Sequence, residues 1–210
     1  MAIEMATQQE RKKQRRNQIK AAAQKLLFEK GYQATSIADI AKVAEISPVT
    51  LYKYFESKDQ IGEEIVLSLI NDGYADYQKM IDNEKISFED LIKMMMRGGV
   101  GMTSNMSVGF YKFIVKELRE NETVKAAYND RKGYFWNSLI KRGRDAGLIS
   151  PTISNAALMV YLDMYIQYAQ NPINKDQYEA HSEVMLSMSE ELNYLFFYGF
   201  MGVPKEENKE

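Results

Sequence analysis

Apolar residues recur every three or four positions through nearly the whole chain, which is the spacing of helices that bury one face. We find no convincing alternation of apolar and polar residues of the kind that predicts a β-strand. The sequence therefore predicts an all-α protein of about nine helices. Six of these follow residue 57 and cover about 58–82, 87–96, 106–119, 122–146, 152–170 and 176–199, with the fifth of them starting at Thr152 or Ser154.

The segment 35–58 contains the signals of two short helices joined by a tight turn. Ser36 precedes Asp39 by three positions, which is the spacing of a capping box that opens a helix. Ser47 is a second candidate N-cap, and Pro48 follows at the first helical position, where its missing N–H costs nothing. Two helices connected in this way form a helix-turn-helix, whose second helix can lie in the major groove of B-DNA.

The hairpin pattern alone leaves two functions open. Leu51 and Phe55 are four residues apart and can face a core, which leaves Val49, Thr50 and Lys53 on outward or flanking faces. These side chains offer a hydroxyl, a cation and an apolar surface, which suit contacts with phosphates and base edges. The alternative is a helical interaction protein that uses the hairpin as a scaffold and does not bind DNA.

A family resemblance favours DNA binding. Gly31-Tyr32, followed by T-S-I-x-D-I-A and S-P-x-T-L-Y-x-Y-F-x-S-K, resembles the tetracycline-repressor (TetR) family of bacterial regulators over roughly the first sixty residues. Two positions depart from the family pattern: Glu45 stands where glycine is common in the turn, and Val49 where a small residue is frequent. If the backbone at Glu45 needs positive φ, the strain is about 1 kcal/mol.

The resemblance implies a domain organisation and a set of DNA contacts. It implies a DNA-binding domain over 1–57 with a basic arm over 1–16, an effector-binding and dimerisation domain over 58–203, and a polar tail over 204–210. Base contacts are expected from Lys53, Val49 and Thr50. The other DNA-contact candidates, carried over by matching motif positions, are Thr35, Ser36, Ser47, Pro48, Tyr52, Tyr54 and Lys58.

Charge is distributed unevenly along the chain. Residues 1–58 hold eleven Lys and Arg against six Asp and Glu, and the rest hold 16 against 23, so the two parts carry +5 and −7 within a net charge of −2. A basic N-terminal part favours contact with nucleic acid. Much of the positive charge is in Arg11, Lys12, Lys13, Arg15 and Arg16, which as an arm would touch phosphates. A solvated helix start is the alternative.

The last two predicted helices are apolar over most of their circumference, so each must be buried on more than one side. A subunit interface explains this, with a monomeric core as the alternative. In the family resembled, these two helices of each subunit form a four-helix dimer interface. A dimer places two reading helices about 34 Å apart on a palindrome. The candidate interface residues are Tyr161, Tyr165, Met185, Met188, Leu192, Leu195 and Phe196.

The middle of the chain is rich in Met, Phe and Tyr, which is typical of an ordinary core and is also compatible with a pocket. The resemblance implies a small effector among the helices between about 87 and 170, whose binding shifts the helix over 58–82. Such a lining suits a lipophilic or aromatic molecule, or a cationic one if either of its two acidic members is buried. The candidates are Met95, Met102, Phe110, Phe113, Tyr128 and Trp136, with Glu117 and Asp163 as polar anchors.

Other functional classes find little support in the sequence. The chain has no cysteine, hence no thiol nucleophile or thiolate metal site, and its lone His181 has no second histidine for a usual metal cluster. The glycines at 98, 99 and 101 lack the spacing of a phosphate-binding loop. We therefore expect no enzyme, cofactor or metal. We also expect no membrane span and no signal peptide, and a cytoplasmic location in a bacterium. The expected function is that of a ligand-responsive repressor that binds a palindromic operator as a dimer.

Overall fold

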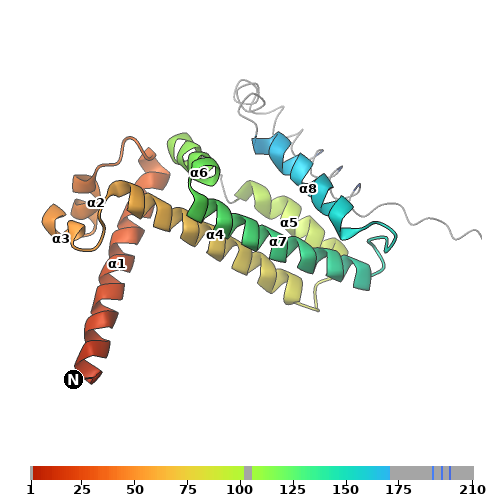
Figure 1. Ribbon diagram of the computed structural model, residues 1–210, viewed down its shortest axis with the longest axis horizontal. Helices are drawn as coiled ribbons and strands as arrows, with labels where there is room; N and C mark the ends of the chain where they lie inside the picture. Colours follow the sequence, from red (N-terminus) through yellow and green to blue (C-terminus); the bar gives the residue numbers. More distant parts are fainter. Residues whose placement is uncertain (1, 102–105, 171–190, 192–194, 196–198, 200–210) are drawn as a thin grey trace, which may run out of the picture. The chain divides into compact units, whose positions relative to one another are not determined.

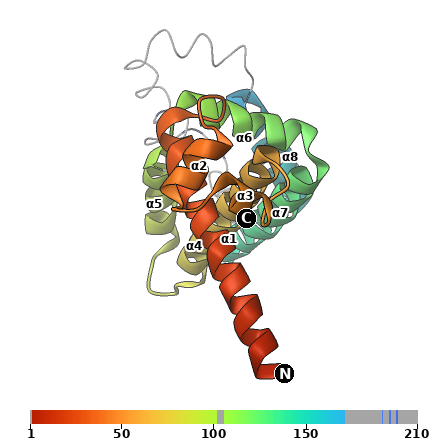
Figure 2. The same cartoon turned by 90° about the vertical axis from the view of Figure 1, so that its left-hand side faces the viewer.

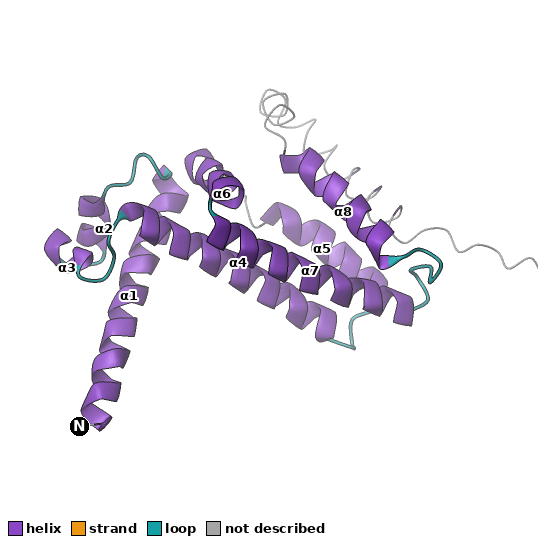
Figure 3. Cartoon of the chain, viewed as in Figure 1, coloured by secondary structure: helices purple, strands orange, loops and turns teal. Residues whose placement is uncertain are grey.

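The computed structural model describes residues 2–101 and 106–170, together with Glu191, Leu195 and Gly199. Every regular element in this part of the chain is a helix (Figure 3). In chain order these are α1 Ala2–Lys30, α2 Ile37–Val43, α3 Pro48–Tyr52, α4 Lys58–Asp82, α5 Phe88–Gly101, α6 Val108–Glu120, α7 Glu122–Asp145 and α8 Asn155–Gln170. The predicted all-α fold with an N-terminal helix-turn-helix is confirmed.

The helix ends agree closely with the sequence pattern. The predicted helix over 58–82 has the bounds of α4, whereas α5 runs to Gly101, beyond the end expected near residue 96. Gly147 has φ +72° just past the end of α7, a conformation that glycine adopts without strain. The ninth predicted helix lies outside the described residues, apart from three helical positions at 191, 195 and 199.

Packing divides the chain into two compact units. The first consists of residues 1–73 and 101–129, and the second of 74–100 and 130–210. The boundary falls inside α4 and again inside α7. The first unit therefore holds α6 as well as the helix-turn-helix. The functional boundary expected at residue 57 stays a prediction, because the packing does not divide the chain there.

The core of the first unit is formed by α1, α2, α3, the first part of α4 and α6. The helix-turn-helix buries the face that its apolar spacing predicts, including Ile40, Leu51 and Phe55. Ile19 and Phe110 bring α1 and α6 into the same core. Both views show the N-terminal part of α1 extending beyond α2 and α3 (Figures 1 and 2). The side chains of residues 8–14 in this helix are exposed, whereas Ile19 lies in the core that supports α3.

The core of the second unit lies between α5, α7, α8 and the last part of α4. Leu91, Leu139 and Ile140 are fully buried, and the rings of Phe135 and Trp136 meet edge to face with centroids 4.7 Å apart. No helix in the described ranges is both long and apolar enough to cross a bilayer.

Candidate nucleic-acid interface

The two short helices begin where local capping chemistry places them. Ser36 Oγ accepts a hydrogen bond from the Asp39 N–H at 3.1 Å, and the Asp39 carboxylate accepts one from the Ser36 N–H at 3.1 Å. The Ser36 hydroxyl also donates to that carboxylate at 2.6 Å. The two hydrogen bonds that the carboxylate accepts, from the Ser36 hydroxyl and N–H, hold the pKa of Asp39 below its usual value. Ser47 Oγ caps α3 by accepting from the Thr50 N–H at 3.0 Å. Both predicted caps are confirmed.

The turn between α2 and α3 contains a strained residue. Glu45 has φ +52°, the single positive φ outside glycine in the described part of the chain. The Ile46 N–H donates to the Ala41 carbonyl at 3.0 Å and the Glu45 N–H to the Lys42 carbonyl at 3.2 Å. This is a Schellman termination, in which the left-handed position is normally glycine. From the sequence, strain is expected if Glu45 adopts positive φ, and the structure shows that it does.

The side chains that α3 offers to solvent differ in how freely they can contact DNA. Val49 is 70% exposed and Tyr52 55% exposed, and Lys53 at the end of the helix is also exposed. Thr50 is half-buried, and its Oγ1 lies 2.9 Å from Ser47 Oγ in a local hydrogen bond. Of the three expected base contacts, Val49 and Lys53 therefore have the more available side chains.

Two of the candidate DNA contacts hold the loop between α1 and α2 together. Thr35 is 1% exposed, and its hydroxyl donates to the Gly31 carbonyl at 2.8 Å. Lys58 Nζ donates to the carbonyls of Tyr32 and Thr35, both at 3.0 Å, and lies 4.2 Å from the centroid of the Tyr32 ring. Burial removes the Thr35 side chain from the surface that DNA can touch, which corrects the expectation for it. The Lys58 ammonium already has three partners in the fold.

The other candidates keep surfaces that can meet DNA. Ser36, Ser47 and Pro48 are exposed, and Tyr54 is half-buried. Their contacts with DNA stay predictions. The Tyr54 carbonyl is occupied within the fold, because Arg16 of α1 donates to it.

The basic residues on α1 differ in their surroundings. Arg16 is half-buried, bonds to the Glu64 carboxylate and lies with its guanidinium 4.1 Å from the centroid of the Phe55 ring. Arg11, Lys12 and Lys13 are exposed on the part of the helix that extends beyond α2 and α3. Arg16 therefore joins α1 to the segment that follows α3 and to α4, and the cations that remain available to phosphates are nearer the N-terminus.

Comparison with known proteins identifies the family to which this helix-turn-helix belongs. The profile described as "Bacterial regulatory proteins, tetR family" matches residues 19–65, the segment from the buried part of α1 into α4. The HTH-type transcriptional regulator UidR of Escherichia coli K12 is 31% identical over 147 residues, which cover 67% of this chain and 72% of UidR. The chain belongs to the TetR family of bacterial regulatory proteins.

Two further similarities are weaker. One covers a smaller share of the relative's sequence, and the other is a similarity of fold. The repressor KstR2 of Rhodococcus jostii is 27% identical over 132 residues, 61% of this chain and 65% of KstR2, so the chain matches less than two thirds of that relative. The crystal structure of Thermus thermophilus FadR, a TetR-family repressor in complex with lauroyl-CoA, superposes with a TM-score of 0.60 at 20% identity over 93% of this chain and 99% of FadR. These relatives are transcriptional regulators, which are not enzymes. The described residues contain no group of three or more side chains that could hold a metal ion.

The residues expected to line an effector pocket fall into two separate cores. Phe110 and Phe113 are buried in the first unit, where the Phe113 ring stacks on Tyr32 with centroids 3.8 Å apart. The Tyr32 hydroxyl donates a hydrogen bond to the Asp59 carboxylate. Burial and this negatively charged neighbour raise the pKa of Tyr32. Met95 and Trp136 are buried in the second unit. Two of the expected lining residues thus belong to the core of each unit, and the effector pocket stays a prediction.

The expected polar anchors already have partners. Glu117 is half-buried and accepts a hydrogen bond from Asn121 Nδ2 at 2.9 Å. Asp163 of α8 accepts from Lys132 Nζ of α7 at 2.7 Å, and its side chain is 47% exposed. Asp163 therefore already has a cationic partner within the protein, and its role as an anchor stays a prediction. Tyr128 is half-buried, and Met102 lies outside the described residues.

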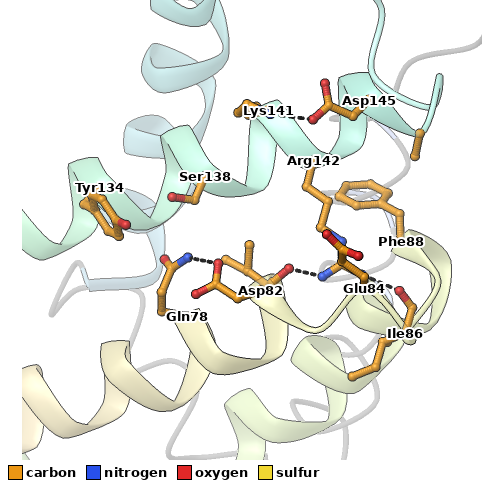
Figure 4. Close-up of a pocket in the computed structure, with 12 residues that line it drawn as sticks. Gln78, Asp82, Glu84, Ile86, Phe88, Tyr134, Ser138, Lys141, Arg142 and Asp145 are labelled. Atoms are coloured by element: carbon orange, nitrogen blue, oxygen red, sulfur yellow. Dashed lines mark hydrogen bonds and ion pairs between the residues drawn. The ribbon is translucent and has the colours of Figure 1, made fainter.

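One hollow in the second unit involves residues that the sequence did not suggest (Figure 4). It has a volume of about 570 Å³ and lies between the end of α4, the following loop and α7. Gln78 donates to Asp82 at 2.7 Å, and its own Oε1 is buried without a hydrogen-bond partner. Lys141 pairs with Asp145 at 2.7 Å on the other side. The lining comes from polar segments about sixty residues apart, so no local pattern could have indicated it.

The expected dimer interface is described only in part. On α8, Tyr161 is exposed together with Val160 and Met164, and Leu195 is exposed as well. The side chains of the other candidates lie outside the described residues, namely Tyr165, Met185, Met188, Leu192 and Phe196. An exposed apolar row on α8 agrees with the reasoning behind the dimer, which stays a prediction.

Proposed function

We propose that this TetR-family chain is a ligand-responsive transcriptional repressor that binds a palindromic operator as a dimer and is released by a small lipophilic or aromatic effector. The observation that carries DNA binding is the capped helix-turn-helix, in which α3 presents Val49, Tyr52 and Lys53 to solvent over a core that includes Leu51. An exposed recognition helix on a rigid support is the arrangement that reads a major groove.

The dimer is supported by the apolar side chains on α8. Val160 and Met164 are four residues apart on one face, and both are more than half exposed. Paired exposure of large apolar residues on a helix favours burial against another chain. A two-fold dimer would present two copies of α3 to successive turns of one DNA face, which requires an operator with inverted repeats.

The repressor and effector assignments rest on different support. KstR2 and FadR are both repressors by name, and we carry that mode to this chain as part of the proposal. The lipophilic effector is supported by the apolar side chains of the second unit, among them Met95, Phe135 and Trp136, which offer methionine and aromatic surface. We also propose a cytoplasmic location in a bacterium and no catalytic activity.

The test uses the full chain and DNA flanking its own coding region. A gel-shift titration should give a tight complex with this DNA and a much weaker one with a shuffled duplex of equal composition. The affinity should fall steeply with salt because phosphate contacts release counterions. Sedimentation should give two chains per duplex. Equal binding to the shuffled duplex would contradict the proposal and favour the helical interaction protein.

The effector is tested on the complex so formed. Lauroyl-CoA and free dodecanoic acid serve as lipophilic probes, with coenzyme A alone as the control that lacks the acyl chain. Release of DNA by the acyl probes and not by coenzyme A would support a lipophilic effector. Release by none of them would contradict that class while leaving DNA binding intact.

A further inference from the structure

Val49 is a highly exposed apolar residue at the start of the proposed recognition helix. Among the large apolar side chains whose exposure the structure describes, within 8–95 and 106–164, none is more exposed than Val49, at 70%. It is the second residue of α3, directly after Pro48. Residues near the N-terminus of a recognition helix are the ones that reach base edges. An apolar side chain is thus offered where the proposed function needs sequence reading.

The chemistry of valine restricts what it can read. It has no hydrogen-bond donor or acceptor, so it cannot recognise the polar edges of guanine, adenine or cytosine. The C5-methyl group of thymine is the apolar feature of the major groove. A β-branched side chain on a helix is held in one strongly preferred χ1 rotamer, so the two methyl groups of Val49 are fixed before DNA arrives.

The two residues that flank Val49 have little free polar capacity in their side chains. Pro48 has no N–H to donate, and the Thr50 hydroxyl is engaged with Ser47 Oγ at 2.9 Å. Lys53 lies one turn further along α3. The first turn of the helix therefore offers an apolar contact, and the end of the helix offers a cation.

We infer that Val49 makes this regulator dependent on a thymine methyl group at one fixed position in each operator half-site. The inference rests on the proposed function, and it concerns the departure from the small residue that the family often has at this position. Burying one methyl group at the interface is expected to change affinity about fourfold. In a two-fold operator, removal of the methyl group from both half-sites should lower the affinity about fifteenfold.

The experiment begins with in vitro selection of duplexes by the full chain from a random library. Each thymine of the selected site is then replaced by deoxyuridine, which keeps the base pair and removes only the methyl group. Binding is measured for the wild type, for Val49→Ala and for Val108→Ala. Val108 is a matched control, because it is an exposed valine near the start of α6 in the same unit, at 56% exposure.

The expected result is a double-mutant cycle with coupling at one symmetric position. Wild type and Val108→Ala should lose about fourfold in affinity for each deoxyuridine there, and Val49→Ala, which keeps a single methyl group, should discriminate clearly less between the thymine and deoxyuridine duplexes. Because Val49 is exposed, Val49→Ala should unfold like the wild type, which circular dichroism checks.

Three outcomes would overturn the inference. A selected site without such a thymine would do so, and so would equal binding of thymine and deoxyuridine by the wild type, or unchanged discrimination in Val49→Ala. Each of these leaves specific DNA binding in place. Failure of the selection to enrich any sequence would instead overturn the proposed function itself.

Discussion

Ser107 Oγ donates a 2.8 Å hydrogen bond to the backbone carbonyl of Leu27, eighty residues earlier in the chain. The Ser107 N–H also donates to the Phe28 carbonyl at 2.8 Å, so one residue satisfies two carbonyls near the end of α1. Both carbonyls belong to the last turn of α1, where partners within the helix run out, and the Leu27 carbonyl also accepts from the Gly31 N–H at 3.0 Å. The start of α6 thereby caps the end of the helix that supports the DNA-reading hairpin.

Ser107→Ala should destabilise the protein by about 2 kcal/mol, because it removes this long-range hydrogen bond together with the N-cap of α6. Ser154→Ala is the matched control, since Ser154 caps α8 by accepting from the Ala157 N–H, a bond local to its own helix. It should cost about 1 kcal/mol. Urea unfolding of both variants checks the difference, and equal losses would show that the Leu27 bond contributes nothing.

Two glycines of α7 should respond to alanine in opposite directions. A Cβ at Gly143 would lie 2.5 Å from Ile149 and 2.7 Å from Phe88, whereas one at Gly133 would meet nothing within 4 Å. Gly143→Ala should destabilise by about 1–3 kcal/mol through overpacking. Gly133→Ala should stabilise by up to about 1 kcal/mol, the difference in helix propensity. Thermal unfolding of the pair is the measurement, and a stabilised Gly143→Ala would contradict the packing.

Helix starts and turns were predictable because the groups that decide them are close in sequence. Ser36 and Ser47 act on N–H groups three residues away, and the strain at Glu45 belongs to its own φ. What each apolar face packs against was not predictable. The spacing marks Phe110 and Phe113 as buried, but their place in the first core depends on contacts with α1 and α4 that lie tens of residues away.

The candidate site shows the same limit. The exposure of Val49 and Lys53 follows from helical spacing around Leu51, so α3 could be assigned its outward face from sequence. The partners of Lys58 and Arg16 could not be assigned, because a basic residue reads as solvated or phosphate-binding until the carbonyls or carboxylates around it are known.

Glu45→Gly should stabilise the protein by about 0.5–1 kcal/mol. Glycine relieves the left-handed strain at φ +52°, although it also gives the unfolded chain more freedom, which offsets part of the gain. Glu45→Ala is the control, because it removes the same charge and keeps the Cβ that causes the strain. The free energy of unfolding, measured in urea, should rise for glycine and stay near the wild-type value for alanine. A gain of equal size in both variants would assign the effect to charge.

Lys53→Ala and Lys58→Ala should separate DNA reading from structural support. Lys53 is exposed at the end of α3, so its loss should alter sequence preference in a selection experiment and leave the unfolding midpoint unchanged. Lys58 holds the Tyr32 and Thr35 carbonyls, so its loss should lower stability by about 1–3 kcal/mol. It should weaken all DNA sites alike, because the loop before α2 loses its anchor.

Lys58→Arg is the control for charge. It keeps the positive charge but replaces the compact ammonium with a planar guanidinium. It should therefore restore the wild-type salt dependence of DNA binding more fully than the wild-type stability. A normal unfolding midpoint in Lys58→Ala, combined with a salt slope lower by one phosphate contact, would instead assign Lys58 to the DNA backbone.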